Sequence, residues 1–177
     1  MVPKTLVLAC RAPGRGRIGR LYLRELCMLY PRDRVCCFHM DPAGAKAASA
    51  EMAWLPMKYA PCPPERGWYG LGSRVRRASR PLVEAYVGLF KTPRLIEQAI
   101  QFGRQHRAEA LWVPLHTPTT IRMARRVAQA LGAPLYTTIW DDGEYVLKKI
   151  FGMDSLSCRR LVSEFARAQR YLSLIHI

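Results

Sequence analysis

The stretch Thr5–Leu29, TLVLACRAPGRGRIGRLYLRELCML, decides how the rest of the chain is interpreted. Its apolar run from Leu6 to Cys10 predicts a buried strand, and the apolar residues that recur at helical spacing up to Leu29 predict a helix. Between them lies a loop with the pattern Gly14-x-Gly16-x-x-Gly19. A strand, a glycine-rich loop and a helix in this order are typical of the opening of a nucleotide-binding α/β domain.

The same loop predicts a phosphate-binding site. The first turn of a helix offers unpaired N–H groups and a partial positive charge, and glycine lets a phosphate approach the backbone closely. Arg15 and Arg17 would add fixed charge and forked donors. The expected phosphate-binding residues are Gly14, Gly16, Arg17 and Gly19. The alternative interpretation is a flexible arginine-rich turn.

Length and charge narrow the possible functions. A chain of 177 residues is one ordinary domain or half of a two-domain protein, and half of its residues are hydrophobic, enough for a real core. Its net charge of +15 implies an anionic partner: phosphate, nucleic acid or an acidic membrane face. Arginine enrichment that follows genome base composition is the alternative. No apolar run approaches the roughly 20 residues that span a bilayer, and the first residues resemble no cleavable signal.

The cysteines and the C-terminal residues give two further expectations. None of the six cysteines forms a C-x-x-C pair, so buried free thiols in a reducing cytosol explain them better than disulfides or zinc ligands. Residues 172–177, LSLIHI, read back into codons as one frame of a transposon-end sequencing adapter. We therefore expect a non-native tail after Tyr171, a natural chain that continues further, and one α/β domain over residues 1–171.

The segment after the first helix contains a possible ribose ligand. Arg34–Met40 predicts a second strand, in which His39 is a packed or edge residue. Asp41 follows it, 22 residues after Gly19, where an acid in a dinucleotide-binding fold would bind the ribose. The alternative for Asp41 is a turn residue before Pro42. Residues 42–53 are alanine-rich and predict a short helix.

Residues 54–80 are expected to form an irregular aromatic and basic excursion. Residues 54–72 are rich in proline, glycine and aromatic residues, and they predict no regular element. The arginines that follow, interleaved with aromatic rings, could bind single-stranded nucleic acid. They could also lie on an anionic membrane surface with Leu71 and Val75 inserted, or form a solvated basic loop. The candidate acceptor or membrane residues are Trp68, Tyr69, Arg74, Arg76 and Arg77.

The second half of the chain predicts a parallel sheet. Strands at Ala110–Leu115 and Leu135–Trp140 flank a helix that Thr117 caps and Gly132 ends, and this βαβ unit requires parallel strands and a right-handed crossover. The other predicted helices are Pro81–Phe90, one that Thr92 caps and that runs to about Arg107, one from Asp141 to about Phe151, and Ser157–Gln169. The expected fold is an open parallel α/β sheet with helices on both faces.

Three loops are expected at the carboxyl edge of this sheet, where ligands of such folds bind. They are residues 11–19, the loop with His116, and the loop that begins at Trp140 and contains Asp141. His116 and Asp141 are therefore the candidate catalytic residues. Each also has a plain alternative, because His116 precedes a helix cap and Asp141 lies where a carboxylate stabilises a helix N-terminus.

The order of elements resembles the N-terminal half of a GT-B glycosyltransferase of the family 4 type. The motifs that carry the resemblance are GRGRIGR, LWVPLH and APLYTTIWDD. It implies an acceptor-side Rossmann-like domain and transfer of a sugar from a nucleotide-sugar to a hydroxyl, without a metal or other cofactor. The family's donor-binding C-terminal domain is missing from this sequence, so the piece alone is expected to be inactive. The family's last strand often ends in histidine, and Asp141 is the substitute here.

Two other classes of function remain open. One is the NAD(P)-binding Rossmann domain of an oxidoreductase, which would use the glycine pattern and Asp41. The other is a basic module that binds nucleic acid or a membrane surface through its +15 charge. The expected location is the cytoplasm, including the inner face of the membrane.

Overall fold

The core of the molecule is a parallel sheet. The computed structural model describes residues 2–15, 18–40, 49–61, 81–83, 85–115, 117–138, 147 and 155–170. Within them, five strands lie in the order β3-β2-β1-β4-β5, and every neighbouring pair is parallel. The strands are β1 Thr5–Ala9, β2 Val35–His39, β3 Met57–Tyr59, β4 Ala110–Pro114 and β5 Leu135–Thr138. The predicted fold class, an open parallel α/β sheet, is confirmed.

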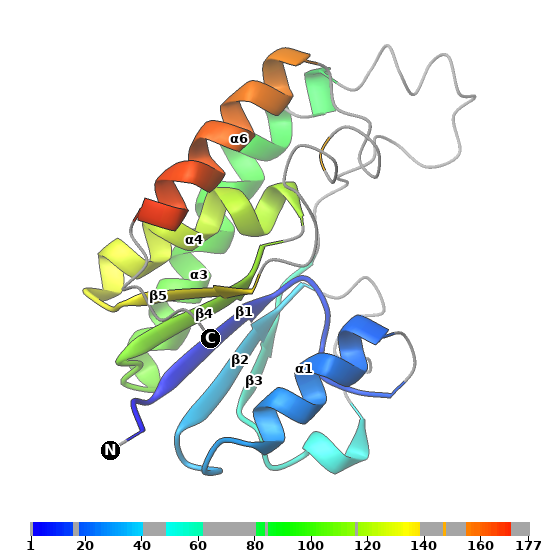
Figure 1. Cartoon of the computed structure of the whole chain (residues 1–177), viewed down its shortest axis with the longest axis vertical. Coiled ribbons are helices and arrows are strands. Elements are labelled where there is room, and N and C mark those ends of the chain that lie inside the picture. The colour runs from blue at the N-terminus through cyan, green and yellow to red at the C-terminus, as the bar shows by residue number, and fades with distance from the viewer. Residues whose placement is uncertain are drawn as a thin grey trace.

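Helices cover both faces of this sheet (Figure 1). They are α1 Ile18–Met28, α3 Thr92–Gln105, α4 Pro118–Leu131 and α6 Ser155–Arg170, with a short 3₁₀ helix η2 at Ala50–Met52 and a π-helical segment η3 at Val87–Lys91. On one face, α1 packs through Leu23 and Cys27. On the other face, α3, α4 and α6 bury a larger set of apolar side chains.

Strand β1 shows why both faces must be covered. All five of its residues are buried, and successive side chains point to opposite faces. Leu6 and Leu8 belong to the core under α3 and α4, whereas Val7 and Ala9 belong to the core under α1. The unbroken apolar sequence of β1 therefore matches a strand inside a doubly covered parallel sheet.

The βαβ unit β4–α4–β5 is confirmed together with its local signals. The Thr117 hydroxyl accepts a hydrogen bond from the Thr120 N–H at 3.2 Å, and the Thr120 hydroxyl accepts one from the Thr117 N–H at 3.3 Å. This reciprocal arrangement caps two N–H groups at the start of α4. Gly132 ends α4 in the left-handed region with φ +63°.

Two expectations were wrong. Residues 54–72 were expected to be irregular, but Met57–Tyr59 forms β3, whose residues pair with Cys37–His39 of β2. Thr92 was expected to cap a helix, but its backbone is helical and its N–H donates to the Val87 carbonyl. Residues 81–83 and 85–86 are also helical, so no free helix end exists at Thr92. The wide π turn lies directly before Pro93, whose ring would clash with a carbonyl in an ordinary α turn.

Other predicted boundaries shift by a few residues. The strand predicted to reach Trp140 ends at Thr138 within the described residues, and the last helix runs over Ser155–Arg170 rather than Ser157–Gln169. Of the helix expected over residues 42–53, the described part contains only η2. The helix expected from Asp141 lies outside the described residues except for the buried Leu147. No helix in the described part of the chain has the length and apolar character to cross a bilayer.

Gly103 lets α3 pack closely against its neighbours. A Cβ atom placed there would lie 3.0 Å from Leu131 Cδ1 of α4 and 3.1 Å from Leu6 Cδ2 of β1. Both distances are tighter than ordinary van der Waals contact. The missing side chain therefore allows one helix to contact the sheet and a second helix at the same point.

Gly132→Ala should destabilise the protein by about 1–2 kcal/mol, because an L side chain is strained at a positive φ. A Cβ atom there would meet no atom of the described residues within 4 Å, so the cost is conformational. Urea unfolding followed by circular dichroism measures the change. Gly88→Ala is the matched control. Its Cβ also meets no described atom within 4 Å, but Gly88 lies inside the helical segment η3. That substitution should stabilise by about 0.5–1 kcal/mol. Equal effects at both positions would contradict this explanation.

Candidate functional site

The strand order creates one preferred place for a ligand. From β1 the chain moves to β2 and β3 on one side, and it then returns to the other side of β1 to form β4 and β5. The loop after β1 leads to α1 on one face, and the loop after β4 leads to α4 on the opposite face. The carboxyl ends of β1 and β4 therefore flank a topological switch point, where ligands bind in open α/β sheets.

The described part of the β1–α1 loop folds back along α1. Ala12, Pro13 and Gly14 are buried, and the Gly14 N–H donates to the Arg20 carbonyl at 3.1 Å. Gly14 thus anchors the loop, and its amide is already paired in this arrangement. Gly19 lies in the first turn of α1.

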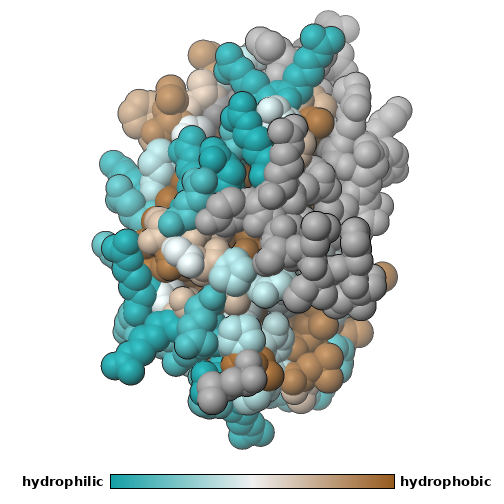
Figure 2. Space-filling view, turned by 60° about the vertical axis from the view of Figure 1, so that its left-hand side comes forward, coloured by the Kyte–Doolittle hydropathy of each residue, from teal (hydrophilic) through white to brown (hydrophobic). Residues whose placement is uncertain are grey.

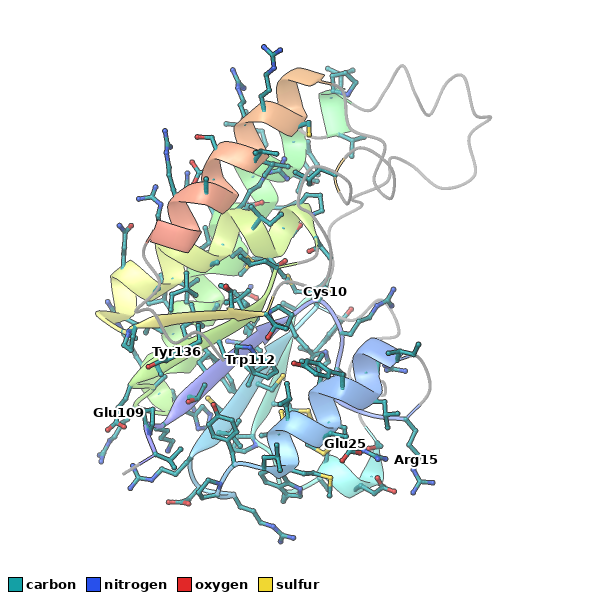
Figure 3. All side chains as sticks on the ribbon, in the orientation of Figure 1. Cys10, Arg15, Glu25, Glu109, Trp112 and Tyr136 are labelled. Atoms are coloured by element: carbon teal, nitrogen blue, oxygen red, sulfur yellow. The ribbon has the colours of Figure 1, made fainter. Side chains whose placement is uncertain are left out.

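Arg15, next to the glycine pattern, contacts a carboxylate. Its guanidinium pairs with Glu51 of η2, which also accepts a hydrogen bond from Arg24 at 3.0 Å. Figure 3 shows Arg15 near η2 and away from Cys10 at the end of β1. An exposed ion pair contributes at most about 1 kcal/mol, so an anionic ligand could compete with Glu51 for Arg15.

The start of α4 lies on the other side of the switch point. Pro118, Thr119 and Thr120 are buried there, and the Leu115 N–H donates to the Thr138 carbonyl at 3.0 Å. This hydrogen bond joins the carboxyl ends of β4 and β5. The short polar side chains after β4 therefore lie at a firmly held helix start, where the helix dipole favours an anion.

Aromatic rings lie at the ends of β2 and β3 and within β4 and β5. His39 at the end of β2 is buried, and its ring lies 5.6 Å from the Tyr59 ring at the end of β3. The expectation that His39 is a packed histidine agrees with this position between β1 and β3. On β4 and β5, the Trp112 indole N–H donates to the Thr138 hydroxyl at 2.9 Å, and Figure 3 shows Trp112 beside Tyr136, its partner in the β4–β5 register.

Most predicted site residues lie outside the described residues. Gly14 and Gly19 are described, and both belong to the β1–α1 connection. The predicted site residues outside the described part are Gly16, Arg17, Trp68, Tyr69, Arg74, Arg76, Arg77, His116 and Asp141, and the possible ribose ligand Asp41 is outside it too. The shared position of Gly16, Arg17, His116 and Asp141 at the carboxyl edge stays a prediction, although Leu115 and Thr117, on either side of His116, lie at that edge.

Sequence reasoning did not single out Glu51 or Thr119. Glu51 is 36 residues from Arg15, and no local pattern indicates that the two side chains pair. The run Thr117-Pro-Thr-Thr120 could have drawn attention to the start of α4, because it places three hydroxyl groups within one turn. Among the described residues, no group of three histidine, cysteine or acidic side chains could hold a metal ion.

The described cysteines are buried free thiols, as expected. Burial, and to a smaller degree the neighbouring Cys36, raises the pKa of Cys27 from 9.0 to about 12. Burial likewise raises the pKa of Cys36 to about 12 and that of Cys37 well above its ordinary value. Because the thiolate is the reactive form, these three thiols are poor nucleophiles and are not candidates for catalysis.

Iodoacetamide at about pH 8 should leave Cys27, Cys36 and Cys37 unmodified in the folded protein, since buried thiols with a raised pKa form little thiolate. Peptide mass spectrometry reads the modification, and the urea-unfolded chain is the positive control.

The free energy of unfolding should also fall as the pH rises above 9. There the unfolded chain forms thiolates that the folded chain cannot form until the pH nears 12. Cys36→Ala should make this fall shallower. Rapid native labelling, or an unchanged slope, would contradict the assignment.

Comparisons with known proteins were made by a scan against family models and by searches of curated proteins and solved structures, none of which found a match. The functional proposal therefore depends on the strand order, on the two helix starts at the switch point and on the charge of the chain. The resemblance that the sequence motifs carry adds the class of reaction, which is transfer of a sugar.

Proposed function

We propose that this chain is the acceptor-side, N-terminal part of a GT-B-type glycosyltransferase, which moves a sugar from a nucleotide-sugar to an acceptor hydroxyl. The observation that carries the proposal is the reversal of strand order between β1 and β4. This reversal puts the loop at residues 10–14 and the start of α4 on either side of the switch point. A site at such a switch point suits the diphosphate of a nucleotide-sugar.

The leaving diphosphate would need positive charge. The start of α4 offers a helix dipole, and Arg15 could contribute its charge if it exchanged Glu51 for a phosphate oxygen. Arg17 and Gly16, in the same loop by sequence, are proposed to complete the phosphate contact. Stabilisation by fixed donors lowers the barrier for departure of a charged leaving group. His116 and Asp141 are proposed to orient the acceptor hydroxyl and take its proton.

The length of the loop after β1 favours this proposal over an NAD(P)-binding domain. In a dinucleotide-binding fold, a tight glycine turn carries the first strand directly into the helix. Here residues 10–17 separate β1 from α1, and Gly14 bonds back to Arg20 instead of opening the helix. The oxidoreductase alternative therefore has weaker support, although its ribose ligand, Asp41, lies outside the described residues.

The proposal includes a cellular location. Thiols that are kept protonated by burial suit a reducing cytoplasm. The acceptor is proposed to lie at the inner face of a membrane, held by the predicted residues Trp68, Tyr69, Arg74, Arg76 and Arg77. Binding of nucleic acid is the less favoured use of the same charge.

Titration of the labelled protein with uridine and guanosine diphosphates, followed by amide NMR, tests the site. Saturable shifts are expected in two groups, residues 10–15 and residues 117–120, because these flank the switch point. Glu109 is the internal control, since it precedes β4 at the opposite edge of the sheet and its amide should not shift (Figure 3).

Two results would contradict the proposal. Shifts spread over surface arginines and abolished by moderate salt would indicate nonspecific charge binding. Saturable binding of NADH that Gly16→Val removes would favour the oxidoreductase alternative. The purified chain should leave nucleotide-sugars intact, because the resemblance puts the main part of the donor site in a second domain and leaves only the diphosphate contact here. Measurable sugar transfer would show that this division of the site is wrong.

A further inference from the structure

In the helical segment at residues 81–83 and 85–91, apolar side chains lie on the buried face and on the exposed face. Val83 and Val87 point inward and are buried. On the outer face, Leu82 is 73% exposed, Tyr86 46%, Leu89 69% and Phe90 58%. A helix on the surface of a globular protein ordinarily shows a polar outer face. The outer face of this segment is therefore built to be covered.

The outer residues form one continuous stripe, which we call the 82–90 stripe: Leu82, Tyr86, Leu89 and Phe90. Positions 82, 86, 89 and 90 follow helical spacing, so these side chains share a face. The Tyr86 and Phe90 rings lie 5.8 Å apart. Contiguous exposed apolar side chains of this kind mark an interaction site rather than the scattered exposure that is normal for a surface.

The stripe is held rigidly. The segment runs through η3 into α3 without a break, because Thr92 keeps helical backbone angles. The inner face of α3 is fixed in the larger core by Leu95, Ile96, Ala99 and Phe102. The stripe therefore projects from a firmly anchored helix at one end of the molecule, beside the uppermost helical turns in Figure 1.

Basic residues lie at the same end of the molecule as the stripe, on its own helix and on α6. The Lys91 ammonium lies 5.7 Å from the centre of the Tyr86 ring, and Arg94 is exposed one turn further along. Arg159 and Arg160 are exposed in the first turns of α6, which Figure 1 places at the same end of the molecule. Figure 2 is turned about the vertical axis of Figure 1, and in its upper part hydrophobic side chains lie next to hydrophilic ones.

We propose that the 82–90 stripe inserts into the interface of an anionic lipid bilayer. Leu82, Leu89 and Phe90 enter the boundary between headgroups and acyl chains. Tyr86 lies at headgroup level, where aromatic rings with a polar end are favoured, and Lys91 and Arg94 contact lipid phosphates. This partner suits both features of the surface, because a lipid interface accepts aliphatic side chains and attracts the cations beside them.

The exposed aliphatic side chains favour lipid over nucleic acid. Nucleic acid would match the cations but offers no environment for exposed Leu82 and Leu89. The inference does not depend on the proposed sugar transfer. It also places the membrane contact at residues 82–90, whereas the sequence suggested insertion of Leu71 and Val75, which lie outside the described residues.

Sedimentation with vesicles tests the proposal. The full chain should bind vesicles of mixed phosphatidylglycerol and phosphatidylcholine and should bind pure phosphatidylcholine about tenfold more weakly, since anionic headgroups attract the cations. The double substitution Leu89→Gln with Phe90→Gln should weaken binding to the anionic vesicles by about tenfold or more, because it removes the inserted groups. Lys91→Gln should weaken it less and should reduce the preference for anionic lipid.

The matched control is Leu29→Gln, because Leu29 is 79% exposed at the end of α1, away from the stripe. It should leave vesicle binding unchanged. Circular dichroism and thermal melting would show that all variants fold. Unchanged binding by the double variant, or equal loss in Leu29→Gln, would overturn the proposal. So would a homodimer in light scattering that the double variant dissociates, because the stripe would then be a protein interface.

Discussion

Burial of β1 on both faces is the constraint on which the rest of the structure depends. A parallel strand in the middle of a sheet has no face that can meet water, so its odd and even residues need separate apolar layers. Leu6 and Leu8 require the layer that α3 and α4 supply, and Val7 and Ala9 require the layer that α1 supplies. Because the chain moves from β1 to one side of the sheet and from β4 to the other, right-handed crossovers supply these layers with α1 on one face and α4 on the opposite face.

The switch point follows from the same reversal of strand order. With α1 on one face and α4 on the other, the loops after β1 and β4 diverge at the carboxyl ends of the two strands, where ligands bind in open α/β sheets. The residues at this switch point decide its chemistry, and here they combine a buried Gly14 with a hydroxyl-capped helix start.

Sequence reasoning succeeded where the signal is local. The apolar runs of β1, β2, β4 and β5, the Thr117 cap and the Gly132 terminus are each encoded within a few residues. It missed β3 because Met57–Tyr59 has only three residues, half exposed, and exists through its pairing with β2. It misjudged Thr92 because the π turn before Pro93 continues an earlier helix. At the site, sequence reasoning missed the hydrogen bond from Gly14 to Arg20 and the ion pair between Arg15 and Glu51. Both contacts depend on how the loop folds, and no periodicity in the sequence indicates that fold.

The close approach at Gly103 links three distant parts of the chain. Leu6 from β1 and Leu131 from α4 fill the space that a side chain at residue 103 of α3 would need. A larger residue at 103 therefore requires the side chains of residues 6 and 131 to shift or to become smaller. In any set of relatives, these three positions should covary by volume, and such compensated changes would report the three-way contact without a structure of each relative.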